Sequence, residues 1–437
     1  MTIRPVEILQ HLIRFDTTNP PGNEILCINY LNNLLTEAGF ETQILAKEPS
    51  RANLVTRLSG QGNAPPLLLQ GHVDVVSTAG QPWTRPPFDG LIEDGYLWGR
   101  GALDMKSGVA MMVAALIRAK AEGASLPGDV ILAVVSDEEY EGVYGARYLV
   151  EEHPYLFEGV RYAIGEGGGV SDYISGRKFY PIMVGEKQVC WMKATLRGEG
   201  GHASIPRSGG AMTKLAQMLA QLDQRRLPVH LTPVVRQLIE ALMDVLPAPV
   251  SDLMCQLLEP ELTDKALDKI GGEDGRWLNA LLRNTVTPTV VRGGSQTNVI
   301  PTEITLQLDG RLLPGFTPDD MLAELRPIIG NEVDIEIEQF NPGPPPPDMA
   351  LYDTLADILR QADPQGIPIP TLATGVTDAA FFARLGIQTY GFLPLNMPPD
   401  FNWWSTIHNA DERVPLAALD FGTNAVYSAL QRFGEMN

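Results

Sequence analysis

Short apolar runs alternate with amphipathic stretches through the first 185 residues of the chain. The runs at 66–69, 129–135 and 161–164 predict strands, because they are brief and continuously apolar. The longer stretches between them predict helices at 6–14, 25–38, 105–121 and 144–152. This alternation is typical of a mainly parallel sheet with helices on both faces, so we predict a doubly wound α/β fold for this part.

The pattern changes near residue 186. A β-type segment at 189–197, a helix at 211–222 and strands at 303–312 and 332–338 predict a separate α+β unit. The stretch NPGPPPPD at 341–348 predicts a stiff connector, because proline fits neither a helix interior nor a central strand. Helices at 349–362 and 416–433, with an apolar run at 389–393, then return to α/β character. We therefore expect segments 1–185 and 341–437 to form one discontinuous domain, with 186–340 inserted into it.

Composition, net charge and cysteine spacing disfavour several classes of protein. The 437 residues are 44% hydrophobic and 20% charged, which predicts a globular chain. The net charge of −20 disfavours nucleic acid and anionic membrane surfaces as partners. The three cysteines form no CxxC pair, so neither a disulfide framework nor a thiolate metal site is indicated. We see no signal peptide and no membrane-spanning run, and we therefore expect a cytoplasmic protein.

Histidines and carboxylates gather where the predicted strands end. His72 and Asp74 in GHVD lie two residues apart, so an extended backbone places both on one face, where the carboxylate could orient the imidazole. Taken alone, this pair fits a solvated strand end as well as it fits a functional site. Asp104 precedes an apolar helix and could simply cap it.

Three further positions extend the set. Glu138 and Glu139 end a buried strand, and adjacent carboxylates there could divide the tasks of metal ligand and proton acceptor. Glu166 follows the next strand, and His408 lies in a polar loop near the C-terminus. For each alone, a solvated acidic loop, a flexible turn or an exposed histidine is an ordinary alternative. Together, imidazole and carboxylate without thiolate favour zinc, cobalt or manganese, with one carboxylate able to bridge two ions.

The ordered motifs of the chain resemble a known family: the zinc-dependent aminoacylases, acetylornithine deacetylases, succinyl-diaminopimelate desuccinylases and glutamate carboxypeptidases. The resemblance runs from TTNPPGNE at 17–24 to the loop of His408. It rests on the motifs GHVDVV, GRGALDMKSG, SDEEYEG, GEGGG, GGHAS, SQTNVIP, DGRLLPG and TGVTDAAFF.

The resemblance implies a two-zinc centre, with Co²⁺ or Mn²⁺ as possible substitutes. His72 and Glu166 would hold one ion, Glu139 and His408 the other, and Asp104 would bridge them. Asp74 would orient His72. Glu138 would be the general base that takes a proton from water and passes it to the leaving amine.

The resemblance also assigns roles outside the metal ligands. It makes 1–185 and 341–437 the catalytic domain and 186–340 a dimerisation domain, so a homodimer is expected. His202 would reach the site of the partner subunit and stabilise the oxyanion. Asn298 and Arg311 would bind the carbonyl and terminal carboxylate of the substrate, a task that suits a planar guanidinium. A loop histidine, a turn asparagine and a surface salt bridge are the plain alternatives.

These features predict an enzyme that cleaves a C–N amide bond beside a free carboxylate, acting on an N-acyl amino acid or a short peptide. The GEGGG sequence after the strand favours the aminoacylase and carboxypeptidase branches. A biosynthetic acetylornithine deacetylase or desuccinylase is the alternative, and a non-catalytic metal-dependent binding protein is the rival from another class. Asp378 is interpreted as a helix cap, and Trp403 and Trp404 either wall an apolar substrate pocket or pack.

Overall fold

The computed structural model describes residues 3–341 and 346–435. Its contacts divide the chain into two compact units. Unit 1 comprises Met1–Gly185, Pro347–Thr371 and Thr377–Asn437, and unit 2 comprises Glu186–Pro346 and Leu372–Val376. Unit 1 is therefore discontinuous in sequence. Residues 342–345 of the proline-rich stretch lie outside the described residues.

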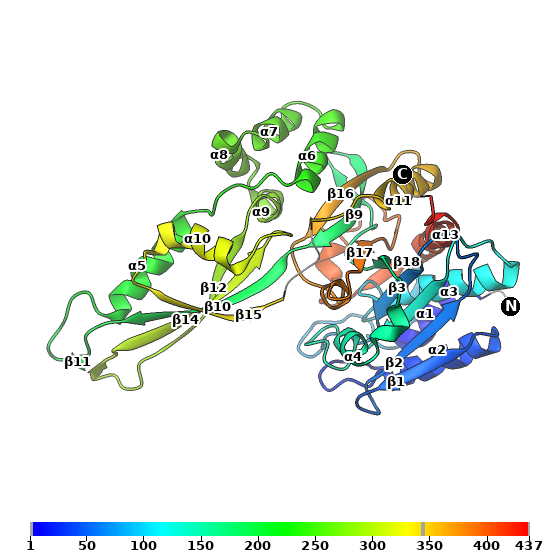
Figure 1. The fold of residues 1–437 in the computed structure, drawn as a ribbon, viewed down its shortest axis with the longest axis horizontal. Helices are drawn as coiled ribbons and strands as arrows, with labels where there is room; N and C mark the ends of the chain where they lie inside the picture. The colour runs from blue at the N-terminus through cyan, green and yellow to red at the C-terminus, as the bar shows by residue number, and fades with distance from the viewer. Residues whose placement is uncertain (1–2, 342–345, 436–437) are drawn as a thin grey trace. The chain divides into compact units, whose positions relative to one another are not determined.

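Unit 1 is built on a large mixed sheet (Figure 1). The four strands at its centre are parallel: β6 (Val130–Val135), β3 (Leu67–His72), β7 (Tyr162–Gly165) and β17 (Gln388–Gly391). Strands that include antiparallel pairings flank them. On one side lie β2 (Ala52–Leu58) and β1 (Thr42–Ala46), and on the other lie β9 (Arg177–Glu186) and β16 (Ile367–Ala373), with β8 (Asp172–Ile174) paired to β9. The predicted α/β class with a mainly parallel centre is confirmed, whereas the antiparallel flanks were not predicted.

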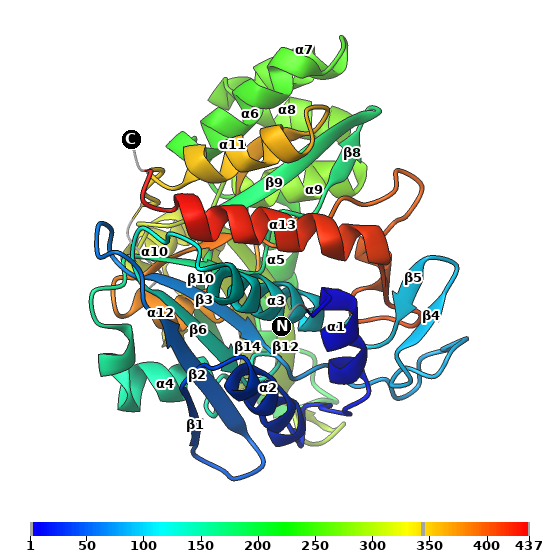
Figure 2. The same cartoon turned by 90° about the vertical axis from the view of Figure 1, so that its right-hand side faces the viewer.

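Helices cover both faces of these central strands, which explains why every residue of the strands is buried. Ile131, Ala133 and Val135 share a core with α4 (Ala146–Glu152) and with Phe382 of α12 (Ala379–Ala383). On the opposite face, Gly71 lies against Met105 and Val109 at the start of α3 (Lys106–Glu122). The helices α1 (Pro5–Ile13) and α13 (Leu416–Arg432) pack on α3 (Figure 2).

The remaining elements of unit 1 are peripheral to the central strands. They are α2 (Ile25–Glu37), α11 (Tyr352–Ala362), and a small sheet of β4 (Leu91–Glu93), β5 (Tyr96–Trp98) and β18 (Arg413–Pro415). The predicted helices match α1, α2, α3, α4 and α13 to within two residues. The helix predicted from residue 349 begins three residues later, because Asp348 accepts the backbone N–H of Ala350 in a turn.

Unit 2 contains a four-stranded antiparallel sheet in the order β12 (Thr285–Gly293), β14 (Glu303–Leu312), β10 (Gln188–Arg197) and β15 (Asp334–Phe340). Apolar side chains of β10 and β14 share a core with α5 (Ala211–Gln224) and α10 (Pro318–Ile329). Alternate residues of β14 are buried, as expected for a sheet covered on one face. The α+β character predicted for this segment is confirmed.

Four consecutive helices of unit 2 were not predicted: α6 (Pro233–Val245), α7 (Val250–Leu257), α8 (Pro260–Ile270) and α9 (Gly272–Leu281). They pack on one another in sequence order. A short ladder of β11 (Gly201–His202) and β13 (Val299–Ile300) completes the unit. Within 3–341 and 346–435, we find no helix with the length and apolar character that crossing a bilayer requires.

Candidate active site

His72 ends the buried strand β3, and its side chain is fully buried. Its Nδ1 lies 3.0 Å from the backbone carbonyl oxygen of Asp74 and 3.5 Å from the carboxylate of the same residue. A carbonyl can only accept, so Nδ1 carries a proton, and Nε2 is the ring nitrogen that would face a metal. The carbonyl of Asp74 is thus nearer to His72 than the carboxylate that the sequence predicts to orient it.

The carboxylate of Asp104 lies between the two predicted metal-binding histidines. Oδ1 of Asp104 is 3.2 Å from Nε2 of His72, and Oδ2 is 3.1 Å from Nε2 of His408. Nε2 of His408 is also 3.2 Å from Oε2 of Glu139. The structure therefore brings residues together that are separated by more than 300 positions in the sequence, with one carboxylate shared by two imidazoles.

Glu138 and Glu139 leave the end of β6 in a tightly held turn. Asp137 has a positive φ of 68°, and its carboxylate binds Arg51 and Asn19 at 2.9 Å each, so it is a structural residue. The carboxylate of Asp74 accepts the backbone N–H of both Glu138 and Glu139 at 3.1 Å. Asp74 thereby fixes the turn that carries the predicted base and the predicted ligand beside it.

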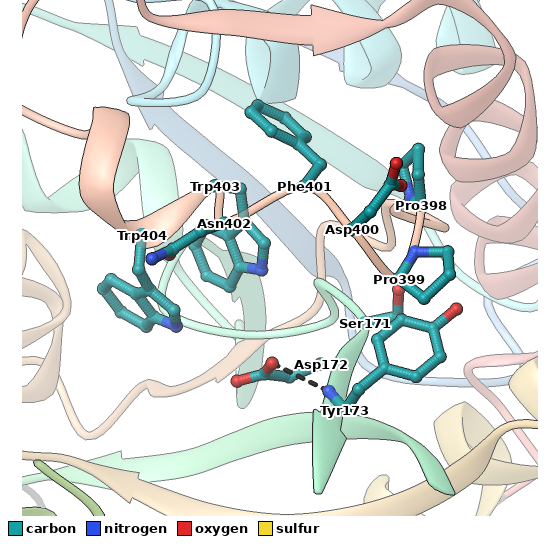
Figure 3. Close-up of a pocket in the computed structure, with 10 residues that line it drawn as sticks. All are labelled: Ser171, Asp172, Tyr173, Pro398, Pro399, Asp400, Phe401, Asn402, Trp403 and Trp404. Atoms are coloured by element: carbon teal, nitrogen blue, oxygen red, sulfur yellow. Dashed lines mark hydrogen bonds between the residues drawn. The ribbon is translucent and has the colours of Figure 1, made fainter. Parts of the chain in front are cut away.

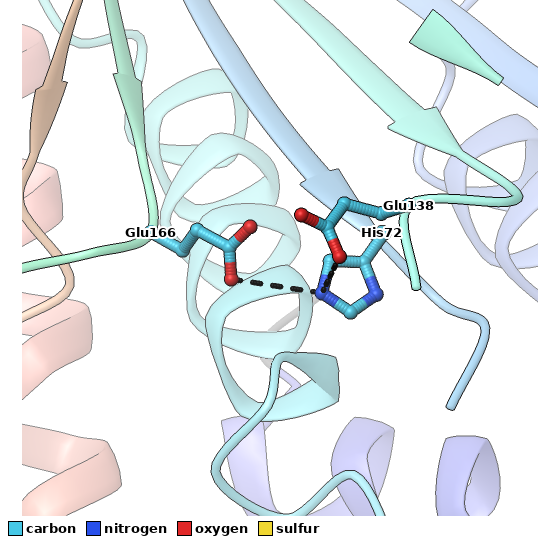
Figure 4. Close-up of side chains that lie close together, drawn as sticks. All are labelled: His72, Glu138 and Glu166. Carbon is cyan, nitrogen blue, oxygen red and sulfur yellow. Dashed lines mark ion pairs between the residues drawn. The ribbon is translucent and has the colours of Figure 1, made fainter. Parts of the chain in front are cut away.

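Glu166 follows β7 and completes the cluster (Figure 4). Its Oε2 lies 3.6 Å from Nε2 of His72, and Oε2 of Glu138 lies 3.8 Å from the same nitrogen. A side chain on Gly391 of the neighbouring strand would approach the carbonyl oxygen of Glu166 to 2.6 Å. The absence of a Cβ there allows the backbone of Glu166 to pass close to β17.

Burial is the main influence on the charges of Glu138 and Glu166, and repulsion between carboxylates adds to it. Burial, together with the charge of Glu166, raises the pKa of Glu138 well above its usual range. Burial likewise raises the pKa of Glu166. Hydrogen bonds to Asp104 and Glu139 raise the pKa of His408 to about 10. A cation placed among these groups would relieve the repulsion and reverse these preferences.

The donor set fits divalent metal ions. Ligand atoms of His72, Asp104 and Glu139 lie within 4.8 Å of one another, and so do those of His72, Glu138 and Glu166. Across residues 3–341 and 346–435, the ion pairs of these carboxylates are with histidines only, and Oε1 of Glu139 is buried without a hydrogen-bond partner. Glu138 is close enough to His72 and Glu166 to be a metal ligand itself. Its predicted role as the general base therefore rests on the sequence motif and not on its distance from these groups.

Three predicted residues lie in unit 2. His202 on β11 pairs with Val299, and the carbonyl of Asn298 accepts the backbone N–H of Ala203 at 3.0 Å. Nδ1 of His202 accepts the backbone N–H of Ser204 at 3.2 Å, so Nε2 carries the proton and is a hydrogen-bond donor. Arg311 on β14 forms a two-point ion pair with Asp309 at 2.7 and 3.1 Å, which is the plain alternative considered for it.

Asp378 was interpreted as a helix cap, and the structure corrects this. It occupies the N-cap position of α12 but makes no side-chain capping bond. The residue is buried, and neither carboxylate oxygen has a hydrogen-bond partner among the described residues. Burial raises the pKa of Asp378, and the charges of Glu166 and Asp74 raise it further. Asp378 therefore interacts electrostatically with the carboxylates of this site. The sequence signal was its acidic side chain in an otherwise apolar helix start.

The tryptophan pair lines a separate hollow of about 220 Å³ in unit 1 (Figure 3). The rings of Trp403 and Trp404 stack with centroids 4.3 Å apart. Trp403 is buried, whereas Trp404 is 63% exposed. The burial of Trp403 agrees with the packing alternative, and Trp404 borders the hollow with most of its surface exposed. A substrate role for Trp404 stays a prediction.

Comparison with known proteins gives the family of the chain. Residues 68–432 match the model of peptidase family M20/M25/M40. The chain belongs to this family. The matched region contains all five predicted metal ligands together with Glu138 and Asp74. As the resemblance in sequence implied, this M20 chain is a member of a family of peptidases and amidohydrolases that act on amide bonds.

Two curated relatives and one solved structure show the breadth of that family. The M20 chain is 28% identical to human N-fatty-acyl-amino acid synthase/hydrolase PM20D1 over 384 residues, which cover 85% of this chain and 75% of the relative. It is 28% identical to a probable succinyl-diaminopimelate desuccinylase of Staphylococcus epidermidis, covering 86% of this chain and 85% of the relative. The M20 metallo-carboxypeptidase Sso-CP2 of Sulfolobus solfataricus has the same fold, with a TM-score of 0.68 at 17% identity over 99% of this chain and 100% of that one.

Proposed function

We propose that this M20 chain hydrolyses an amide bond adjacent to a free carboxylate in an N-acyl amino acid or short peptide, using two divalent metal ions. The observation that carries the proposal is the carboxylate of Asp104, shared between the imidazoles of His72 and His408. A carboxylate between two sets of nitrogen and oxygen donors is the arrangement that a two-metal hydrolase requires.

The proposed ligand sets follow this geometry. His72 and Glu166 would hold one ion, and Glu139 and His408 the other, with Asp104 bridging them. Zinc suits these donors, with cobalt or manganese as substitutes. When bound, such ions supply Lewis acidity that polarises a carbonyl group and lowers the pKa of water.

The side chains of the chain itself would move the proton. Glu138 faces the same cluster as Glu166, where its carboxylate would accept a proton and return it to the leaving amine. His202 would donate its Nε2–H to the oxyanion, a role that its proton position supports. In our proposal it acts on the site of a second copy of the chain, so the active form is a homodimer.

Substrate class is inferred from the carboxylate-binding candidates and from the relatives. Arg311 would bind the terminal carboxylate of the substrate by exchanging its ion pair with Asp309, and Asn298 would bind the carbonyl. The names of both curated relatives denote an amino acid that carries an N-acyl group. A biosynthetic desuccinylase is therefore the second candidate. We place the enzyme in the cytoplasm, which its free cysteines Cys27, Cys190 and Cys255 support.

Metal content and hydrolysis measured on one sample test the proposal. Elemental analysis should find about two metal ions per chain, and N-acetyl amino acids or dipeptides should be cleaved until a chelator is added. The rate of succinyl-diaminopimelate hydrolysis, measured alongside these substrates, tests the second candidate, a desuccinylase. Bound metal without cleavage of any amide would favour a binding protein, and failure to bind metal after reconstitution would overturn the ligand assignment.

A further inference from the structure

The buried carboxylate of Glu412 holds the backbone that leads into Asp104. Oε1 of Glu412 accepts the N–H of Leu103 at 2.7 Å and that of Asp104 at 3.2 Å. Oε2 accepts the N–H of Gly101 at 3.0 Å. Three backbone donors on one carboxylate fix the path of this loop, because hydrogen bonds to an ionised acceptor are shorter and stronger than neutral ones.

The same carboxylate is tied to the loop of His408. Arg100 donates to Oε2 of Glu412 at 2.6 Å and to the carbonyl oxygen of Asn409 at 3.2 Å. Arg100 also donates to Oε1 of Gln81 at 2.7 Å, and Nε2 of Gln81 donates to the carbonyl oxygen of His408 at 2.8 Å. Glu412, Arg100 and Gln81 therefore form one network, hereafter the Glu412 network, which joins the loops of Asp104 and His408.

The backbone that this network holds is strained. His408 has a φ of 57° and Asp411 a φ of 61°, in the left-handed region that side chains other than glycine disfavour. Such conformations persist only where surrounding contacts determine them. Besides the bond from Gln81 to His408, both carboxylate oxygens of Asp411 accept hydrogen bonds from Thr84 at 2.9 Å. Hydrogen bonds from Gln81 and Thr84, which lie outside this loop, therefore hold the backbone that positions the imidazole of His408.

We propose that Glu412 is a positioning residue of the metal centre: it sets the separation between Asp104 and His408 and so determines metal affinity, most of all that of the ion held by both residues. Glu412 would not contact the metal or the substrate. Its action would resemble that of other groups that orient metal ligands, whose loss weakens metal binding about 10–100-fold. This inference rests on the proposed two-metal function.

Glu412→Gln tests the inference, because it preserves the shape of the side chain while replacing one acceptor oxygen with an amide donor. Cobalt is titrated into the metal-free protein, and d–d absorption and calorimetry follow the binding of each ion. We expect the ion held by His408 to bind about 10–100-fold more weakly, and the other ion, which shares only Asp104, to be weakened less. Gln81→Ala provides a second variant, since Gln81 is only partly buried, and should weaken the ion held by His408 by a smaller factor.

Asp363→Asn is the matched control. Asp363 forms a partly buried ion pair with Lys178 at 2.8 Å in the same unit, and its substitution removes a charge without touching the Glu412 network. This control should bind both ions as the wild type does. Equal weakening in the control would mean general destabilisation and would overturn the inference.

The remaining outcomes separate the two proposals. If wild type binds two ions and both Glu412→Gln and Gln81→Ala bind them with unchanged affinity, the positioning role is wrong while the proposed function stands. If Glu412→Gln does not fold, Gln81→Ala decides by the same criterion. If wild type itself binds no metal, the proposed function fails, and the positioning role fails with it.

Discussion

The carboxylate of Asp74 accepts the backbone N–H of Glu138 at 3.1 Å. Its second oxygen accepts the N–H of Glu139, so one side chain fixes the predicted base and a predicted ligand together. Asparagine offers one acceptor oxygen in place of two and would leave one of these N–H groups unpaired. A hydrogen bond to a charged group contributes about 1.5–3 kcal/mol, so we expect Asp74→Asn to lower kcat about 10–100-fold. Steady-state kinetics with metal content measured in parallel would check this, and full activity would contradict it.

Glu138→Gln should separate metal binding from turnover. If Glu138 is the base, the variant retains both metal ions but cannot accept a proton, and kcat should fall by about 10²–10⁴-fold. Metal content, substrate affinity and kcat are measured on the same preparation. Loss of one metal ion together with activity would instead identify Glu138 as a ligand, in agreement with its place in the group of His72 and Glu166.

His202 can be tested by mixing subunits. Glu138→Gln and His202→Ala homodimers should each be nearly inactive. A heterodimer has one site with an intact Glu138 and a His202 donated by the other subunit, so about a quarter to a half of wild-type activity per dimer should return if the residue acts across the interface. Heterodimers are purified with two affinity tags. Inactive heterodimers of confirmed composition would exclude action across the interface.

Asp363 predicts a specific pH dependence of stability. Burial acts against its charged form, but hydrogen bonds from Lys178 and Tyr180 outweigh burial and hold its pKa below the usual value. The unfolded chain then binds the proton more readily. The stabilisation is complete above the unfolded pKa of about 3.9 and is lost as the pH falls through the lower folded pKa. Asp363→Asn should destabilise the protein by about 1–2 kcal/mol at pH 7.

Urea unfolding from pH 7 down to pH 3 would measure this effect. The difference between wild type and Asp363→Asn should shrink as the pH falls below about 4. A difference that stays constant over this range would mean that the ionised carboxylate is not the source of the stabilisation.

Much of unit 1 could be predicted because its strands are buried on both faces. Continuous apolar runs such as β6 are visible in sequence, and the rule that ligands gather at the carboxyl ends of parallel strands led from them to Glu138 and Glu166. Among the flanking strands, β1 was missed for the opposite reason. β1 is largely exposed, so its sequence carries little apolar signal. The helix α6 does carry a start signal in its sequence, a Thr232 cap followed by Pro233.

The Glu412 network lay beyond sequence reasoning for a physical reason. Glu412 and Gly101 are 311 positions apart, and nothing in either local sequence indicates that they meet. Asp378 shows the converse case. Its place before α12 made a capping bond the simplest expectation, and only the fold reveals that its carboxylate is buried without a partner among the described residues.

The discontinuity of unit 1 has a consequence for synthesis of the protein on the ribosome. β17 lies between β7 and β9 in the sheet, although it is translated after both. At the usual rate of translation, the interval from Gly165 to Gln388 takes roughly 10 to 45 s. During this time the facing edges of β7 and β9 have no partner between them, and unpaired edges invite association with other chains. His408 is translated later still, so the nascent chain could complete the proposed metal centre only after nearly the whole protein has emerged.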